Sequence, residues 1–188
     1  TGRLLAVALE SGETSAVEYP RSFAEDYLGG FGVNNRLCAE FCRPGTDPFS
    51  PDNPVVLGAG PLVGTAVPGA SRVMANARFP LTGAVASASG SMGLGANLKW
   101  AGWDHLVIRG AAPSPAMLVI EDEKVELVPA SGLWGKGILD TTRALWDGHP
   151  GFSVLAIGPA GENRAHSSLA MVDACATLGR GGLAAVLG

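Results

Sequence analysis

One pattern occurs twice in this chain, about a hundred residues apart. It is a short apolar run that ends in Gly-Pro, followed by a loop of small residues and then by an arginine. The first copy is Val55-Val56-Leu57-Gly58-Ala59-Gly60-Pro61 and the second is Val154-Leu155-Ala156-Ile157-Gly158-Pro159, with Arg72 and Arg164 in the segments that follow. Apolar runs of this length, bounded by glycine and proline, are typical of buried strands. Their recurrence indicates two related β-rich halves.

Short strands and short helices account for most of the remaining chain. Apolar and alternating runs predict strands at 4–9, 14–19, 55–57, 72–78, 106–108, 116–120, 124–128 and 154–157, of which the first two form an opening hairpin. Helical spacing predicts two short helices across 21–41, separated by glycines at 29, 30 and 32, and another helix at 138–146. The expected fold class is therefore α+β.

Glycine is about twice as frequent as in an average protein. The chain contains 27 glycines, whereas average usage of roughly 7% predicts about 13. Between Gly83 and Gly95, all residues are small except Val85, Met92 and Leu94. Glycine allows tight turns and lets a ligand approach the main chain closely. This segment is therefore predicted to form a surface against which a ligand can lie.

Length, charge and cysteine content exclude several classes of protein. With 188 residues, 47% of them hydrophobic and 16% charged, the chain is expected to form one globular domain. A net charge of −4 argues against nucleic-acid binding, and no apolar run approaches the roughly 20 residues of a membrane span. Cys38, Cys42 and Cys175 are too few for a disulfide framework or a four-thiolate cluster. A cytoplasmic location is expected.

The two ends of the sequence favour a fragment of a longer protein. The chain opens with Thr1-Gly2-Arg3, without an initiator Met or a signal peptide, and it stops at Gly188 directly after an apolar run. We therefore expect an excised domain.

Three patterns that could bind a ligand have simpler interpretations. Gly58-x-Gly60-x-x-x-Gly64 follows a predicted strand, but the spacing departs from the dinucleotide fingerprint and Pro61 interrupts it, which favours a Gly-Pro turn. Cys38 and Cys42 share a predicted helical face, yet no further ligand lies nearby in the sequence, so core thiols are favoured over a metal site. The three histidines form no recognisable catalytic triad.

Two arginines lie beside glycines and are candidates for binding an anion. Arg180 is flanked by Gly179 and Gly181-Gly182, and Arg72 follows Pro68-Gly69-Ala70-Ser71. A guanidinium with neighbouring backbone N–H groups can hold a phosphate, although a simple turn between strands explains the Arg180 segment equally well. Two such arginines from two related halves fit a large anionic cofactor with pseudo-twofold symmetry.

Eight sequence blocks, in this order and spanning nearly the whole chain, resemble the N-terminal domain of aldehyde ferredoxin oxidoreductases. The blocks are Leu28-Gly29-Gly30-x-Gly32, Asp47-Pro48-x-Ser50-Pro51-Asp52-Asn53, Gly60-Pro61-Leu62-x-Gly64-Thr65, Pro80-Leu81-Thr82-Gly83, Gly95-x-x-Leu98-Lys99-x-Ala101-Gly102-x-Asp104, Ala130-Ser131-x-Leu133-Trp134-Gly135-Lys136, Ile157-Gly158-Pro159-Ala160-Gly161-Glu162-Asn163 and Gly179-Arg180-Gly181-Gly182-x-x-Ala185-Val186-x-Gly188.

The resemblance implies a fold, a cofactor and a set of contacts. Residues 1–188 would be the N-terminal tungstopterin-binding domain, built from two intertwined β-rich repeats that form a two-sheet base with a few short helices. A tungsten bis-pterin (tungstopterin, a form of molybdopterin) would lie on this base, while later domains, absent here, bind a 4Fe-4S iron–sulfur cluster. The implied cofactor-binding residues are Arg72, Ser89, Ser91, Ala176, Thr177, Gly179 and Arg180.

Three finer features also come from the resemblance. The arginine matching Arg72 links a pterin to the nearby cluster, and backbone carbonyls at Ser89 and Thr177 would help to hold magnesium, a hard cation that prefers oxygen ligands. Aldehyde-oxidising members carry asparagine at the position of Ser89 and a second cofactor-facing arginine at that of Ala176. The missing guanidinium removes a charge-assisted contact of roughly 1.5 to 3 kcal/mol.

The expected function follows from the same resemblance. The complete protein would be an oxidoreductase that converts aldehydes to carboxylates and passes electrons through the 4Fe-4S cluster to ferredoxin or another electron-transfer subunit. This domain contributes no catalytic residue of its own and would be inactive alone. Gly32-Val33-Asn34 and Ile108-Arg109-Gly110 resemble the branch that contains an aryl-coenzyme A reductase subunit. That activity and a non-catalytic scaffold without cofactor are the alternatives, and a homodimer is left open.

Overall fold

The computed structural model describes residues 2–179 and 181–188. Its strands are β1 (Arg3–Ala8), β2 (Glu13–Glu18), β3 (Val55–Ala59), β4 (Val73–Arg78), β5 (Val85–Gly90), β6 (His105–Arg109), β7 (Ala116–Glu121), β8 (Lys124–Pro129), β9 (Leu155–Ala156), β10 (Ala170–Val172) and β11 (Ala176–Leu178). Its helices are α1 (Arg21–Tyr27), α2 (Gly30–Phe41), α3 (Leu94–Trp100), α4 (Ile138–Gly148), α5 (Pro159–Glu162) and α6 (Leu183–Leu187).

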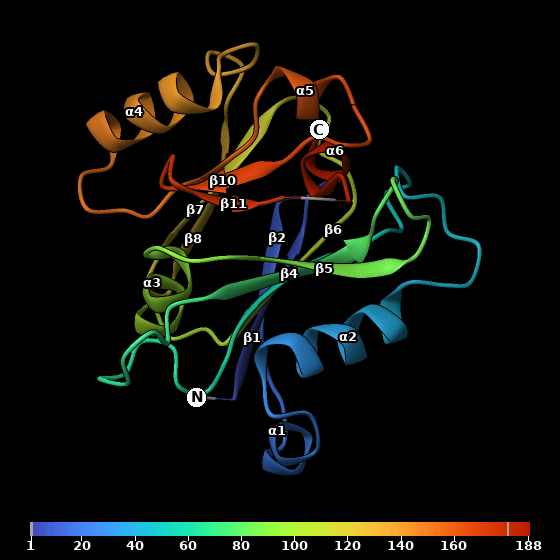
Figure 1. Cartoon of the computed structure of the whole chain (residues 1–188), viewed down its shortest axis with the longest axis vertical. Helices are drawn as coiled ribbons and strands as arrows, with labels where there is room; N and C mark the ends of the chain where they lie inside the picture. The colour runs from blue at the N-terminus through green and yellow to red at the C-terminus, as the bar shows by residue number, and fades with distance from the viewer. Residues whose placement is uncertain (1, 180) are drawn as a thin grey trace.

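The strands form a large mixed sheet, a small sheet and a separate hairpin (Figure 1). The six-stranded sheet has the order β2-β1-β6-β3-β4-β5, in which β6 lies parallel to β1 and antiparallel to β3. The three-stranded sheet has the order β11-β10-β9, and β7 pairs with β8 alone. This architecture confirms the expected α+β class with β-rich halves and short helices.

The repeated sequence pattern corresponds to a repeated topology. Its first copy opens the antiparallel meander β3-β4-β5, and its second copy opens the antiparallel meander β9-β10-β11. Each meander is preceded by a hairpin and a helix (β1-β2 with α2, and β7-β8 with α4) and is followed by a short helix, α3 or α6. The two halves therefore repeat the same order of elements.

The arginines of the two copies do not occupy equivalent places. Arg72 directly precedes β4, whereas Arg164 follows α5 and lies six residues before Ala170, where β10 begins. Arg164 stacks over Phe49, with 5.6 Å between the guanidinium carbon and the ring centroid. Thus the sequence echo predicts the strands but not a shared role for these two cations.

Two hydrophobic layers lie on opposite sides of the large sheet. The larger layer combines Leu57 and Leu106 of this sheet with Val172 and Leu178 of the small sheet. On the other face, Val33 and other apolar residues of α2 pack on β3 and β6. Because adjacent residues of a strand point to opposite faces, Leu57 belongs to the first layer and Val56 to the second.

Glycines at the start of α2 explain both the predicted break and its position. Leu28 ends α1 in the left-handed conformation (φ 61°), Gly29 has φ 94°, and α2 begins at Gly30, three residues earlier than predicted. A Cβ on Gly30 would lie 3.3 Å from the backbone nitrogen of Gly60. The helix therefore begins at a close approach to the loop after β3, which a side chain would obstruct.

A short helix and several short strands were not predicted from the sequence. Residues 94–100 form α3, and β10, β11, α5 and α6 together contain fifteen residues in segments of three to five. Elements this short show too few periods for a hydrophobic pattern to be recognised. The opening hairpin, α4 and most of the longer strands were predicted correctly, whereas the six-residue strand β5 lies in the segment that was predicted only as a small-residue surface.

A buried polar network lies between α2 and the large sheet. The amide nitrogen of Asn34 on α2 donates to the carbonyl oxygen of Met74 at 3.0 Å and to the side-chain oxygen of Asn76 at 3.1 Å. The amide nitrogen of Asn76 in turn donates to the Ser87 hydroxyl at 2.6 Å and to the side-chain oxygen of Asn35 at 3.0 Å. Because buried amides are costly unless they are paired, this network fixes α2 against β4 and β5.

His105 completes the network from β6. Its Nδ1 lies 2.8 Å from the Asn34 side-chain oxygen, which can only accept, so Nδ1 carries the proton. A Cβ on Gly58 would clash with both atoms, so glycine is required where this hydrogen bond crosses β3. Among the described residues, Nε2 of His105 has no hydrogen-bond partner. Burial lowers the pKa of His105 to about 4.

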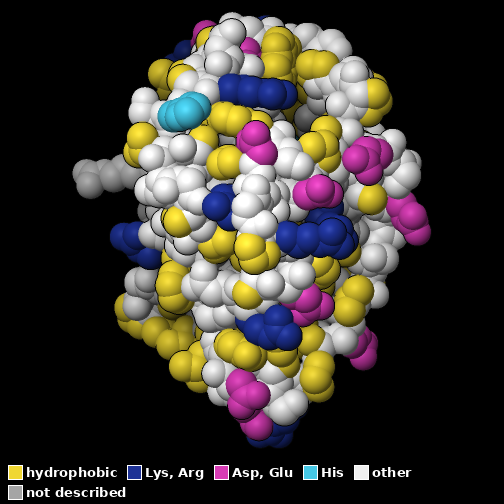
Figure 2. All heavy atoms as spheres, turned by 90° about the vertical axis from the view of Figure 1, so that its right-hand side faces the viewer, with side chains coloured by type: hydrophobic (Ala, Val, Ile, Leu, Met, Phe, Trp, Pro, Cys, Tyr) yellow, Lys and Arg dark blue, Asp and Glu magenta, His cyan; other side chains and the backbone are white. Residues whose placement is uncertain are grey.

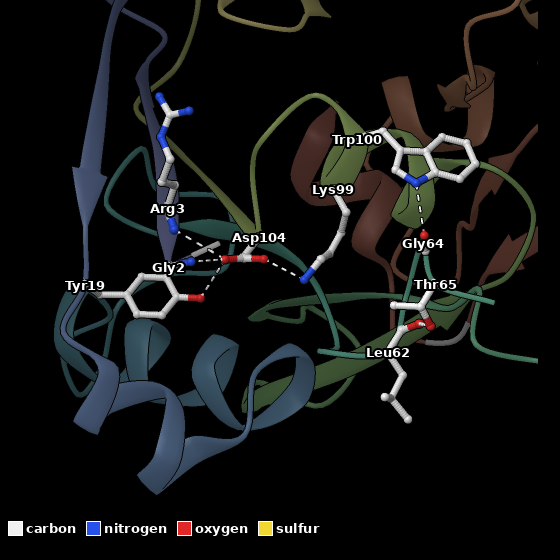
Figure 3. Close-up of polar contacts among 9 residues, drawn as sticks. All are labelled: Gly2, Arg3, Tyr19, Leu62, Gly64, Thr65, Lys99, Trp100 and Asp104. Atoms are coloured by element: carbon white, nitrogen blue, oxygen red, sulfur yellow. Dashed lines mark hydrogen bonds and ion pairs between the residues drawn. The ribbon is translucent and has the colours of Figure 1, made fainter. Parts of the chain in front are cut away.

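Asp104 joins the start of β1, the segment between β2 and α1, and α3 (Figure 3). Its carboxylate accepts hydrogen bonds from the Arg3 backbone N–H at 3.3 Å, from the Tyr19 hydroxyl at 3.1 Å and from Lys99 at 2.7 Å. Next to Lys99, Trp100 donates from its indole to the Gly64 carbonyl at 3.1 Å. Two of the sequence blocks that carry the family resemblance therefore hold α3 in place through these hydrogen bonds.

No helix in the described part of the chain is both long enough and apolar enough to cross a membrane.

We expect the stability of the fold to decrease as the pH falls from 7 to 4.5. The unfolded chain gains a proton on His105 below its ordinary pKa of 6.5, whereas the folded chain does not until about pH 4. The contribution of His105 to the free energy of unfolding is therefore complete above pH 6.5. Roughly 2–3 kcal/mol of it is lost by pH 4.5. Urea unfolding monitored by circular dichroism at both pH values measures the loss.

His105→Gln provides the control for this prediction, because glutamine does not titrate while Asp104 and Lys99 remain as charged neighbours in both proteins. The loss of stability between pH 7 and 4.5 should be smaller in the variant by roughly 2–3 kcal/mol. Equal losses in the two proteins would show that His105 is not held neutral in the folded state.

Candidate cofactor-binding surface

Arg72 and Ser89 come from adjacent strands and contact each other. Arg72 directly precedes β4 and is exposed, while Ser89 lies in β5, directly opposite Met74 of β4. The Arg72 guanidinium donates from Nη1 to the Ser89 hydroxyl at 2.8 Å. Ser91 follows β5 directly and is half-buried. Three of the seven predicted site residues are therefore near one another.

The other predicted residues surround β11. Ala176 and Thr177 are in the strand and Gly179 follows it; Thr177 is exposed and the other two are half-buried. Arg180 lies outside the described residues. A Cβ on Gly179 would meet nothing closer than the Thr177 side chain, at 3.7 Å, so the main chain there is open to close approach.

The two groups of residues meet where β5 contacts β11. A Cβ on Gly90 would lie 3.1 Å from Leu178 and 3.3 Å from Val172, which is tighter than ordinary packing. Each strand is also the edge of its own sheet, and an edge strand carries one row of backbone N–H and C=O groups that no neighbouring strand uses. Ser89 and Thr177 each adjoin a residue of this contact.

Asp173 provides a second link between the halves, and the sequence offered no signal for it. Its carboxylate accepts from the backbone N–H of Gly93 at 3.1 Å, from the Ser153 hydroxyl at 2.7 Å and from the Val154 N–H at 2.8 Å. Gly93 belongs to the loop after β5, whereas Asp173 belongs to the turn between β10 and β11. The carboxylate thus ties the small-residue loop to the second meander.

The Arg72 side chain is free to bind an anion. In the described part of the chain it forms no ion pair, and the Ser89 hydroxyl is its one hydrogen-bond partner. A guanidinium has five N–H donors, so most remain available. On the face shown in Figure 2, basic, acidic and apolar side chains alternate, with no continuous basic stripe. That face thus lacks the extended basic patch of a nucleic-acid-binding protein.

The competing patterns do not form sites in the structure. The segment after β3 consists of turns, so no helix follows the glycines of the loose dinucleotide pattern. Cys38 is fully buried among apolar residues of α2, and this burial raises the pKa of its thiol to about 12. Cys42 is half-buried at the end of the helix. Among the described residues, no three His, Cys, Asp or Glu side chains are grouped as a metal site.

Known proteins are similar to this chain over its whole length. Residues 4–188 match the family described as aldehyde ferredoxin oxidoreductase, N-terminal domain. The chain belongs to this family. It is 39% identical over 189 residues to the tungsten-containing aldehyde ferredoxin oxidoreductase of Pyrococcus abyssi, covering the whole chain and 31% of that relative. The identity to the aliphatic sulfonate oxidoreductase WOR-like subunit of Pyrococcus furiosus is 29% over 204 residues, again covering the whole chain and 32% of the relative.

A solved structure shows the same fold. It is the active site complex BamBC of benzoyl coenzyme A reductase in complex with 1,5-dienoyl-CoA, with a TM-score of 0.96 and 34% sequence identity. The similarity covers all of this chain and 29% of the other. The chain therefore spans about a third of the length of the proteins it matches, which include tungsten-containing aldehyde ferredoxin oxidoreductases.

Replacing Gly90 with valine should weaken the contact between the two halves. The added side chain would have to occupy space that Leu178 and Val172 already fill, and overpacking of this kind costs about 1–3 kcal/mol. Urea unfolding should show the loss. Gly132→Val is the matched control, because no atom lies within 4 Å of a Cβ at that exposed glycine. An unfolding midpoint for Gly90→Val equal to that of the control would rule out a tight contact.

Proposed function

We propose that residues 1–188 are the N-terminal domain that cradles the tungsten bis-pterin of an oxidoreductase, and that the complete protein oxidises aldehydes to carboxylates. The observation that carries the proposal is the exposed Arg72, which donates to Ser89 and forms no ion pair within residues 2–179 and 181–188, beside the contact of two edge strands. Family membership and the tungsten-containing relatives support it. The proposal places the tungstopterin over β5 and β11, with residues from both halves beneath it.

The residues present fit such a group in the first half. The ligand carries phosphates, and Arg72 offers a fork of donors that no carboxylate of the described chain neutralises. Ser89 orients the guanidinium, and the buried pairing of Asn76 with Ser87 holds the same strand in place. A pre-positioned guanidinium loses less side-chain entropy on binding than a mobile one. Arg72 thus contributes both charge and a fixed position.

In the second half, binding depends on main-chain groups and on Arg180. Ala176 cannot contribute charge, and Thr177 and Gly179 offer a hydroxyl and backbone groups beside an exposed edge. We propose that Arg180 supplies the cation on this side. Compared with members that carry an additional arginine at position 176, this protein would hold one phosphate less strongly, by roughly 1.5 to 3 kcal/mol before any compensation.

We also propose a magnesium ion between the phosphates, held in part by the backbone carbonyls of Ser89 and Thr177. The two residues lie in the edge strands of different sheets, and these strands contact each other through Gly90 and Leu178. Magnesium prefers oxygen ligands and keeps several of its waters. Two carbonyls, phosphate oxygens and water would satisfy it without a carboxylate, in keeping with the absence of a grouped acidic site among the described residues.

When bound, the cofactor supplies the two-electron chemistry, and this domain positions it and sets its electrostatic surroundings. The proposal includes a 4Fe-4S cluster in later domains of the complete protein, with Arg72 on the path between pterin and cluster. It also includes transfer of electrons to ferredoxin or a partner subunit in the cytoplasm. The relatives' names, with ferredoxin in one and a subunit in another, support this part.

Reduction of an aryl-coenzyme A thioester is a second candidate, favoured by the TM-score of 0.96 to the benzoyl coenzyme A reductase complex. A scaffold without cofactor is a third, motivated by Ala176 and Ser89. The gene beyond Gly188 separates the third from the others, because a C-x-x-C-x-x-x-C motif downstream would supply cluster thiolates. Kinetic assays with aldehydes and with aryl-coenzyme A thioesters separate the first two.

Metal analysis tests the main proposal. The full-length protein, produced in cells supplied with tungstate, should contain about one tungsten per chain together with two pterins. Inductively coupled plasma mass spectrometry measures the metal, and fluorescence of the oxidised pterin measures the organic part. A protein that contains neither tungsten nor molybdenum would refute the proposal.

Removing the Arg72 guanidinium should reduce cofactor content more than it reduces stability. Arg72→Ala loses a charge-assisted contact of roughly 1.5 to 3 kcal/mol with the ligand, equivalent to about a ten- to hundredfold weaker binding. The folded apoprotein loses one exposed hydrogen bond, so its unfolding free energy should change by less than about 0.5 kcal/mol. Arg180→Ala should behave in the same way.

Arg21→Ala is the matched control, because Arg21 is an exposed cation paired with Glu25 on α1, away from the proposed surface. Tungsten and pterin content in this variant should equal those of the wild type. Full cofactor content in both Arg72→Ala and Arg180→Ala would contradict the assigned role of the two arginines.

A further inference from the structure

Left-handed backbone conformations gather where the two halves meet. Among the described residues, six residues other than glycine have a positive φ, and three of them are Met92 (φ 69°), Asp173 (φ 52°) and Ala174 (φ 51°). Met92 follows β5 by two residues, and the other two belong to the turn between β10 and β11. This conformation is unfavourable for any residue that has a side chain, so surrounding contacts must hold it in place.

Contacts on the C-terminal side of Met92 hold the loop that contains it. The Gly93 backbone N–H donates to the Asp173 carboxylate at 3.1 Å. Two residues further on, a Cβ on Gly95 would lie 3.3 Å from the carbonyl carbon of Arg72. The loop is therefore packed both against the turn before β11 and against the segment that carries Arg72, and Met92 lies beside these two contacts.

Met92 has the one large side chain of this loop that is directed outward. Leu94, the next large residue, packs against the larger hydrophobic layer, and Val85 is at the opposite end of β5. Met92 is 42% exposed. The other methionines are half-buried, namely Met74, Met117 and Met171.

Methionine at position 92 combines two unfavourable features. Glycine adopts a positive φ without steric cost, so methionine retains a backbone strain that glycine would remove. It also leaves an apolar side chain in water. Strained residues cluster at ligand-binding sites, where the bound state makes use of them. The combination therefore indicates a ligand contact for this side chain.

We propose that Met92 is a contact residue for the organic part of the cofactor, and that its thioether packs on the pterin ring system. This inference rests on the proposed function, because Met92 directly follows Ser91 beside the contact of β5 with β11. A methionine sulfur makes favourable contacts with flat aromatic rings, and the unbranched side chain adapts to their shape. Met92 thus holds the ring system, while Arg72 holds the charged part.

Oxidation with hydrogen peroxide tests this contact without an activity assay. Peptide mapping by mass spectrometry measures the sulfoxide formed at each methionine of the full-length protein. The protein is prepared with cofactor, and also without it from cells that cannot make the pterin. Met92 should be oxidised about tenfold more slowly when the cofactor is bound. Met117 on β7 is the internal control and should be oxidised at the same rate in both forms.

Substitutions at position 92 test whether the contact holds the cofactor. Met92→Gly should release the pterin about five- to tenfold faster than the wild type, as measured by fluorescence of the oxidised pterin. Met92→Leu keeps the length and apolar character of the side chain and should restore slow release.

Asp122→Gly is the matched control, because Asp122 is exposed and left-handed (φ 53°) in the turn between β7 and β8. Both glycine variants relieve backbone strain, so both apoproteins should unfold at a urea concentration equal to or higher than that of the wild type. In Asp122→Gly, however, the rate of pterin release should be unchanged.

Cofactor content distinguishes failure of this inference from failure of the proposed function. A full-length protein without tungsten, molybdenum or pterin refutes both. If the protein contains the cofactor, two results overturn the role of Met92 alone. One is oxidation of Met92 at the same rate with and without cofactor, and the other is release from Met92→Gly as slow as from Asp122→Gly.

Discussion

The candidate cofactor-binding surface depends on the contact between β5 and β11, because this contact brings the edge strands of the two related halves together. Gly90 permits the approach, since a Cβ there would press on Leu178 and Val172. Asp173 reinforces it by accepting a hydrogen bond from Gly93 across the same boundary. Each meander alone would present an ordinary edge strand, whereas together the two edges place Ser89 and Thr177 beside a shared junction.

The buried polar network of the first half supports the contact between β5 and β11. Hydrogen bonds from Asn34 to Asn76 and from Asn76 to Ser87 fix α2 relative to β5. Ser87 lies two residues from Ser89 on the same face of this strand. A hydrogen bond to Ser89 then holds the Arg72 guanidinium beside β5. In the second half, β9, β10 and β11 are short, and their sheet has three strands.

Sequence reasoning succeeded where patterns are long and failed where contacts are distant. The opening hairpin, the two helices around Gly29 and the first two strands of the first meander follow local periodicity and glycine chemistry. The sequence also indicated Arg72 through its glycine-containing neighbourhood and the family resemblance. It offered no route to Asp173 or to the pairing of Asn34 with His105, seventy-one residues apart, because ordinary polar residues acquire such roles only when the chain brings them together.

By itself, the sequence determined the β-rich character of this protein, the repeated apolar run with its Gly-Pro ending, and the family to which the chain belongs. These properties depend on local propensity and on residues in a fixed order. The tertiary structure alone decided that the repeat is a repeated topology, that Arg72 rests on Ser89, and that Asp173 links the two halves. Packing between distant segments produces those features, and no local pattern in a single sequence records which segments will meet.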